Sequence, residues 1–169
     1  MIKNTISVDK AIIQIEHVEC SDPSWCREKC IFLESNSQEN NTLTTISFNE
    51  SLSIYVFWES HSSADSFEVL FAPETDVLFI GCGSISARVS TNESKLVGLE
   101  SLCLFWSFRR HKDYVLETGE LECFLYTLDG EKVSSTSVDP PYEMKMLTEG
   151  IKFESIVVGT TWLRYPNNG

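Results

Sequence analysis

Residues 121–138 read LECFLYTLDGEKVSSTSV, and this stretch decides the fold class. The run Leu121–Leu128 carries large apolar side chains on both of its alternating faces, which is typical of a central strand buried on both sides. Asp129-Gly130 separates it from a second strand-like run, Glu131–Val138. Asp-Gly between two such runs favours a β-hairpin with a type I′ turn, because that turn needs positive φ at both central residues. The stretch therefore predicts two antiparallel strands.

Short apolar runs separated by turn residues continue in both directions from this hairpin. Their spacing is typical of an antiparallel meander. In Ile85–Ser90 apolar and polar residues alternate, so one face should lie in a core and the other in water. Glu149-Gly150 predicts a second hairpin. The further predicted strands are Ala11–Val18, Thr44–Phe48, Ser53–Trp58, Phe67–Phe71, Val77–Gly81, Ile85–Ser90, Asp113–Glu117, Tyr142–Leu147 and Ile151–Val158.

Helix signals are few. Asp22-Pro23 is a good helix start and predicts one or two turns up to Arg27 or Lys29. Asn92–Leu102 is a second short candidate, although Gly98 lowers its helix propensity. With about eleven strands and at most two short helices, we expect an all-β fold, an antiparallel β-sandwich or a similar two-layer β fold. We expect a single β domain over residues 1–169 and find no convincing sequence repeat.

The chain is acidic, with 13 Lys+Arg against 25 Asp+Glu and a formal net charge of -12. Nucleic acids and anionic membranes both attract Lys and Arg, so we expect neither as a direct partner. A basic protein partner fits this charge. The first ten residues, MIKNTISVDK, lack the apolar core of a secretion signal. We therefore expect a cytoplasmic protein whose cysteines are mostly reduced.

Charge is distributed unevenly along the chain. No Lys or Arg lies between Lys29 and Arg88, whereas eight acids do. Such a patch steers a basic partner and raises its association rate, and an aromatic residue beside it suits a protein interface. The alternative is that these acids scatter over several faces and serve solubility. The residues predicted to bind the partner are Glu50, Trp58, Glu59, Asp65, Glu68, Glu74 and Asp76.

His17, Cys20, Cys26 and Cys30 are four potential zinc ligands within a short span. Cys26 and Cys30 would face the same way if the segment between them were helical. The spacing differs from the paired CxxC arrangement of zinc knuckles, so we predict no metal site and leave metal binding by these four residues open.

Other candidates for chemistry are weaker. His111 and Asp113 lie near two arginines and could belong to a nucleophilic triad, but the chain has no G-x-S-x-G elbow. Gly81-Cys82-Gly83 lacks the pattern of a phosphate-binding loop and is better explained as a bulge or turn. We therefore predict no catalytic residues, no cofactor and a protein that is not an enzyme.

Four motifs carry a resemblance to known proteins: FWSF at Phe105–Phe108, DYVLETGELE at Asp113–Glu122, LDGEK at Leu128–Lys132 and VDPPYE at Val138–Glu143. With these motifs the chain resembles a family of small uncharacterised bacterial β proteins. In general character it also resembles the immunity proteins of bacterial toxin systems. That second resemblance implies a protein that binds one toxin domain, often a basic nuclease, and blocks its active site.

The leading hypothesis is an immunity protein that occludes the active site of a nuclease toxin. The first alternative is a small β-sandwich enzyme or ligand-binding protein that uses a cleft near His111 and Asp113, or a metal held by the His/Cys residues. The second is an assembly module that pairs through an exposed strand edge. The sequence leaves the oligomeric state open.

Overall fold

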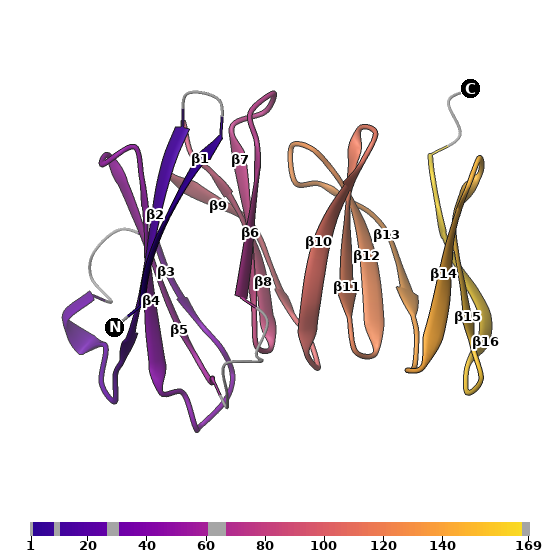
Figure 1. Ribbon diagram of the computed structural model, residues 1–169, viewed down its shortest axis with the longest axis horizontal. Coiled ribbons are helices and arrows are strands. Elements are labelled where there is room, and N and C mark those ends of the chain that lie inside the picture. The colour runs from indigo at the N-terminus through magenta and orange to yellow at the C-terminus, as the bar shows by residue number, and fades with distance from the viewer. Residues whose placement is uncertain (1, 9–10, 27–30, 61–66, 167–169) are drawn as a thin grey trace.

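The computed structural model describes residues 2–8, 11–26, 31–60 and 67–166, which contain sixteen β-strands and one short 3₁₀ helix (Figure 1). The all-β prediction is confirmed. The strands form four sheets that follow one another along the chain and are called sheets I to IV below. Among the described residues, no helix is long and apolar enough to cross a bilayer.

Sheet I has the strand order β1-β2-β4-β5-β3. Its neighbours are antiparallel except for β3, which pairs with β5 in parallel. The 3₁₀ helix η1 (Ser24–Cys26) precedes β3, and the Asp22 carboxylate caps it by accepting the Ser24 N–H at 2.9 Å. The predicted helix start is thus confirmed for one turn, while residues 27–30 lie outside the described residues. The strands are β1 (Ile2–Val8), β2 (Ala11–Glu19), β3 (Ile31–Glu34), β4 (Thr42–Phe48) and β5 (Leu52–Trp58).

Sheets II, III and IV are antiparallel meanders in which strand order equals chain order. Sheet II contains β6 (Phe67–Ala72), β7 (Val77–Cys82), β8 (Ile85–Ser90) and β9 (Lys95–Ser101). Sheet III contains β10 (Phe105–His111), β11 (Tyr114–Gly119), β12 (Glu122–Thr127) and β13 (Lys132–Ser137). Sheet IV contains β14 (Tyr142–Leu147), β15 (Gly150–Ser155) and β16 (Gly159–Arg164).

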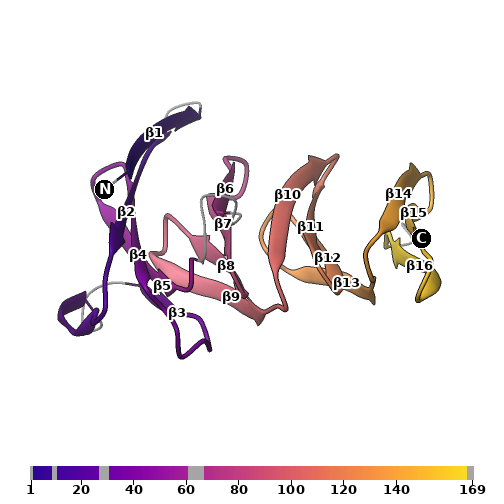
Figure 2. The same cartoon turned by 60° about the horizontal axis from the view of Figure 1, so that its bottom comes forward.

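The four sheets stand face to face in a row, as Figures 1 and 2 show from two directions. A separate apolar core fills each of the three spaces between neighbouring sheets. Strand β7 serves two of these cores, because successive side chains of a strand point to opposite faces. Leu78 and Ile80 belong to the core between sheets I and II, and Val77 and Phe79 to the core between sheets II and III.

Strand β12 confirms the prediction of a strand buried on both faces. Phe124 and Tyr126 pack in the core shared with sheet II, and Cys123 and Leu125 in the core shared with sheet IV. The single sandwich of eleven strands is wrong, because each inner sheet buries both faces and three cores replace one.

Sheets II, III and IV repeat a structural unit that has no obvious counterpart in the sequence. The first strands of sheets II, III and IV begin at Phe67, Phe105 and Tyr142, so the unit is 38 and then 37 residues long. A four-stranded meander of about 40 residues, stacked face to face on its neighbours, is the organisation of a propeller blade. The second residue of the second strand points toward the preceding sheet in each unit. These residues are Leu78, Val115 and Ile151.

Both predicted hairpins are present, but the Asp129-Gly130 turn differs in detail. It spans 128–131, and only Gly130 has positive φ, at +86°, so it is not the two-residue type I′ turn. The Thr127 N–H closes the wider loop by donating to the Glu131 carbonyl at 2.9 Å. The second helix candidate is also wrong, since most of Asn92–Leu102 forms strand β9.

Candidate partner-binding surface

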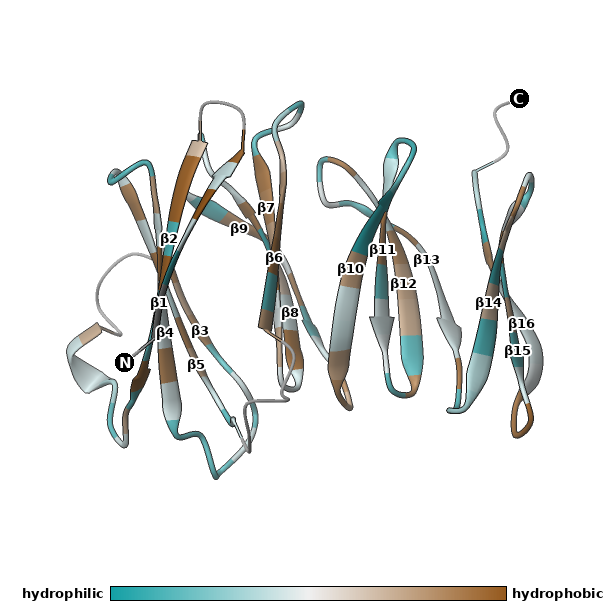
Figure 3. Cartoon of the chain, in the orientation of Figure 1, coloured by the Kyte–Doolittle hydropathy of each residue, from teal (hydrophilic) through white to brown (hydrophobic). Residues whose placement is uncertain are grey.

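Turns of an antiparallel meander alternate between the two edges of the stack. Six hairpin turns therefore fall on the same edge, at the top of Figure 1, and Figure 3 shows that they are mainly hydrophilic. They connect β4 to β5, β6 to β7, β8 to β9, β10 to β11, β12 to β13 and β14 to β15. Hydrogen bonds tie neighbouring turns together: Thr91 N–H donates to the Asp76 carbonyl at 2.8 Å, and Thr75 Oγ1 to the Leu128 carbonyl at 2.6 Å.

Carboxylates dominate these six turns. Eight acids lie in them, all exposed, against one basic residue, Lys112. Three of the turn residues, Glu50, Asp76 and Lys112, have φ between +53° and +58°. We call the surface formed by the eight carboxylates the acidic edge: Glu50, Glu74, Asp76, Glu93, Asp113, Asp129, Glu131 and Glu149.

Two of the eight acids are paired with cations that flank the turns. Arg110 makes a two-pronged contact with Glu74, with nitrogen–oxygen distances of 2.6 and 3.1 Å, and this hydrogen bonding lowers the pKa of Glu74. Lys95 contacts Glu93 at 2.5 Å. Because these pairs are exposed, they contribute little to stability. The acidic edge thus keeps a strongly negative balance.

Three of the sequence-predicted contact residues, Glu50, Glu74 and Asp76, lie together on the acidic edge. The structure adds five acids that were not among the predicted partner-binding residues: Glu93, Asp113, Asp129, Glu131 and Glu149. The available signal was the acid in each of the two predicted hairpin turns, Asp129-Gly130 and Glu149-Gly150.

The structure places the remaining predicted residues elsewhere. Trp58 is only 3 % exposed in the core between sheets I and II, and its Nε1 donates to Thr44 Oγ1 at 2.8 Å. Glu59 follows it at the opposite edge of the stack and accepts a hydrogen bond from Ser37 Oγ. Glu68 lies near the start of β6, where its carboxylate accepts the Phe108 N–H at 2.8 Å. Asp65 lies outside the described residues.

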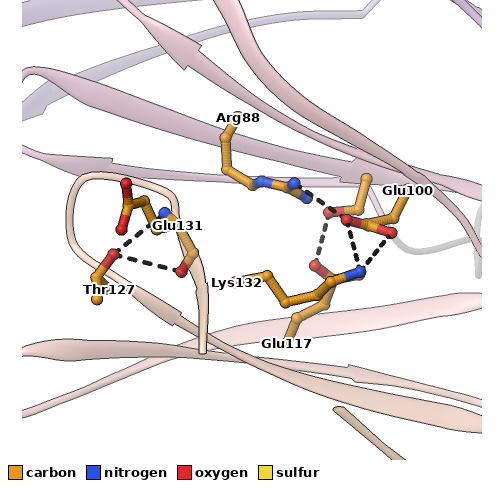
Figure 4. A network of polar contacts seen from close by, with 7 residues as sticks. Arg88, Glu100, Glu117, Thr127, Glu131 and Lys132 are labelled. Carbon is orange, nitrogen blue, oxygen red and sulfur yellow. Dashed lines mark hydrogen bonds and ion pairs between the residues drawn. The ribbon is translucent and has the colours of Figure 1, made fainter. Parts of the chain in front are cut away.

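A polar network, buried at Arg88 and Glu117 and exposed at Lys132, links sheets II and III beneath the acidic edge (Figure 4). Arg88 on β8 is 4 % exposed, and its Nη2 contacts Glu100 Oε1 at 3.1 Å. Lys132 on β13 contacts both Glu100 oxygens at 3.2 Å. The Arg88 guanidinium also lies 4.4 Å from the centre of the Tyr126 ring, a cation–π contact between the two sheets. The network fixes sheet III, and with it the β12–β13 turn, against sheet II.

Glu117 on β11 is the most buried acid in this network, with no exposed surface. Ser86 Oγ donates to its Oε2 at 2.7 Å, but no hydrogen bond reaches Oε1 from the described residues. Burial raises the pKa of Glu117 to about 7, against the opposing effects of Ser86 and Arg88.

The sequence prediction for the polar face of β8 is wrong. Ser86, Arg88 and Ser90 were expected to face water, but sheet III covers them and they are all buried. Gly98 makes room for the network, since a Cβ there would lie 2.0 Å from Arg88 Nη2.

The structure describes three of the four His/Cys residues, namely His17, Cys20 and Cys26. His17 Nδ1 is hydrogen-bonded to Thr44 Oγ1 at 2.8 Å, and burial lowers the pKa of His17. Cys26 is buried, with Sγ donating to the Pro23 carbonyl at 3.0 Å. Cys30 lies outside the described residues, within which no cluster of three or more His, Cys, Asp or Glu has the geometry to hold a metal ion.

His111 is the last residue of β10, and Asp113 lies in the β10–β11 turn of the acidic edge. The His111 ring stacks on Tyr165, with ring centres 5.8 Å apart, and its Nε2 is buried without a hydrogen bond from the described residues. Asp113 is exposed. The stacking contact gives His111 a packing role between sheets III and IV.

Comparison with known proteins gives little guidance. No family model and no curated protein matches the chain. Among solved structures, Kluyveromyces lactis Hsv2 is similar over 61 % of this chain and 35 % of that one, with a TM-score of 0.31 and 10 % sequence identity. The chain thus spans about a third of the length of that protein.

Proposed function

We propose that this chain is an acidic binding protein that neutralises a basic protein partner, most concretely an immunity protein that blocks a nuclease toxin. The observation that carries the proposal is the acidic edge, where six turns from four sheets present eight exposed carboxylates and one lysine. A chain of net charge -12 attracts a basic partner from a distance, and a concentrated edge orients it.

The spacing of the acidic edge suits a substrate-binding groove of a nuclease. Packed sheets lie about 10 Å apart, so the four sheets present groups of carboxylates along a line of about 30 Å. A nuclease binds the phosphates of its substrate with Lys and Arg. Carboxylates presented along such a line would occupy positions meant for phosphates, and the stack behind them would exclude the substrate sterically.

The rigidity of the edge favours tight binding. The polar network around Arg88, Glu100 and Lys132 joins sheets II and III, and the hydrogen bonds of Thr75 and Thr91 join neighbouring turns. Side chains that are held in place before binding lose less conformational freedom when the complex forms.

The test is capture of the partner from lysate of the source cells, followed by an activity assay. The tagged chain is used as bait at low salt and bound proteins are identified by mass spectrometry. We expect one stoichiometric basic protein whose nuclease activity falls when the chain is added. A captured partner with no nuclease activity, or one whose activity the chain leaves intact, would contradict neutralisation.

A pair of variants tests the location of the binding surface. The edge variant replaces four exposed glutamates in the turns of four sheets by glutamine. The control variant makes the same change at four exposed glutamates near the opposite edge, so both have a net charge of -8. The edge variant changes Glu50, Glu93, Glu131 and Glu149, and the control variant changes Glu19, Glu39, Glu122 and Glu143. We expect capture to weaken much more in the edge variant.

A further inference from the structure

A groove between sheets I and II lies outside the acidic edge. Strand β1 ends sheet I and curves beyond β6, the edge strand of sheet II (Figure 2). The space between these strands is a groove of about 480 Å³. Its walls are Asn4, Thr5, Ile6, Ile15, His17, Phe67, Glu68 and Val69.

Apolar side chains and the backbone edge of β6 are accessible in the groove. Ile6 is 37 % exposed, and Phe67 and Val69 on β6 are partly exposed. In the described part of the chain β6 pairs only with β7, so its other edge faces the groove with no strand beside it. An extended segment can add to such an edge by backbone hydrogen bonds.

Two polar side chains of the groove, His17 and Glu68, are held by neighbours. Thr44 Oγ1, which is buried, accepts a hydrogen bond from Trp58 Nε1 and is also bonded to His17 Nδ1. The edge of the Phe67 ring packs against His17, with ring centres 4.7 Å apart. One oxygen of Glu68 is held by the Phe108 N–H. Among its described lining residues the groove thus has one carboxylate, Glu68, and no Lys or Arg.

From this arrangement we infer that the groove binds an extended basic segment of a protein partner, which adds to β6 as a further strand of sheet II. Alternate side chains of the segment would contact Ile6 and Val69, and a lysine or arginine among the others would reach Glu68. The basic character of the segment rests on the proposed function. The strand pairing rests on the edge of β6 that no described strand pairs with, and on the position of β1 beside it.

The probe is a synthetic hexapeptide of alternating lysine and valine, compared with the same peptide N-methylated at alternate residues to remove backbone donors. Affinity is measured by calorimetry, and amide hydrogen exchange is followed over Phe67–Ala72. We expect the unmodified peptide to slow exchange in β6 and to bind at least about tenfold more tightly than the methylated one, because strand addition requires backbone hydrogen bonds. Equal binding of the two peptides would overturn strand addition.

Two exposed isoleucines of sheet I supply a matched pair of variants. Ile6 lines the groove, whereas Ile12 is 51 % exposed and points to the opposite face of the sheet. Ile6→Lys should weaken peptide binding about tenfold, because it places a like charge where an apolar contact is expected, and Ile12→Lys should change it less than twofold. Equal losses in both folded variants would overturn the inference.

Two further outcomes separate this inference from the proposed function. If the edge variant loses the captured partner while Ile6→Lys affects neither partner nor peptide, the groove proposal fails and the proposed function stands. If protection of β6 rises with protein concentration in the absence of peptide, the edge pairs with a second copy, and the inference of a partner segment is overturned.

Discussion

Replacing the buried acid Glu117 by glutamine should make the protein more stable at alkaline pH. The side chain has no exposed surface, and burial raises its pKa in the folded state to about 7 from an ordinary value of 4.5. Glutamine keeps the shape and can still accept the hydrogen bond from Ser86 Oγ. It therefore imitates the protonated acid and removes only the ability to ionise.

The sign and size of the effect follow from proton linkage. The folded protein holds the Glu117 proton more tightly than the unfolded chain, so this stabilisation is complete below about pH 4.5 and is lost as pH rises through 7. The gap between 4.5 and about 7 corresponds to about 3 kcal/mol. The advantage of Glu117→Gln over the wild type should thus grow by about 3 kcal/mol between pH 4.5 and pH 8.5.

The assay is urea unfolding at closely spaced pH values for the wild type, Glu117→Gln and Glu122→Gln. The last variant changes an exposed glutamate on the neighbouring strand and should follow the wild type. Protonation of His17 at acid pH affects all three proteins alike and cancels in the differences. A constant difference between Glu117→Gln and the wild type across this pH range would refute the argument, because it would mean that Glu117 ionises equally easily in both states.

Two further substitutions test the packing between sheets. Gly81→Ala should lower the free energy of unfolding by about 1–3 kcal/mol, because its Cβ would lie 2.2 Å from Cε2 of the buried Phe105 ring; an unchanged urea midpoint would show that the ring has room to move. Trp58→Phe should cost about 1 kcal/mol or more, since it removes the hydrogen bond to the buried Thr44 hydroxyl. Equal stability of this variant and the wild type would argue against that bond.

The sequence predicted eleven of the sixteen strands but not the number of layers. Strand β12 could be predicted as doubly buried because both of its faces are apolar. Strand β8 was misread, because alternation does not distinguish a polar face in water from one covered by another sheet. Arg88 is buried there by contacts with Glu100 on the next strand and with Tyr126 of sheet III, which lies far away in the sequence.

The acidic edge could be predicted only in part for a related reason. Turns of a meander alternate between two edges, so the edge that a turn joins depends on the number of strands before it. The sequence analysis missed five strands, among them β9, where Gly98 reduced the pattern to a weak helix signal, and β10, which begins at Phe105 near the end of the apolar run Leu102–Trp106. Without these strands the turns that carry Glu93 and Asp113 could not be recognised as hairpin turns of this edge.

The most direct test of the central claim is the association rate of the captured partner as a function of salt. The rate constant is measured at low and high ionic strength for the wild type, the edge variant and the control variant. We predict that at low salt the edge variant associates about tenfold more slowly than the control variant of equal net charge, and that the difference shrinks at high salt. Equal rates for the two variants at low salt would contradict the account, because the partner would then respond to total charge and not to the acidic edge.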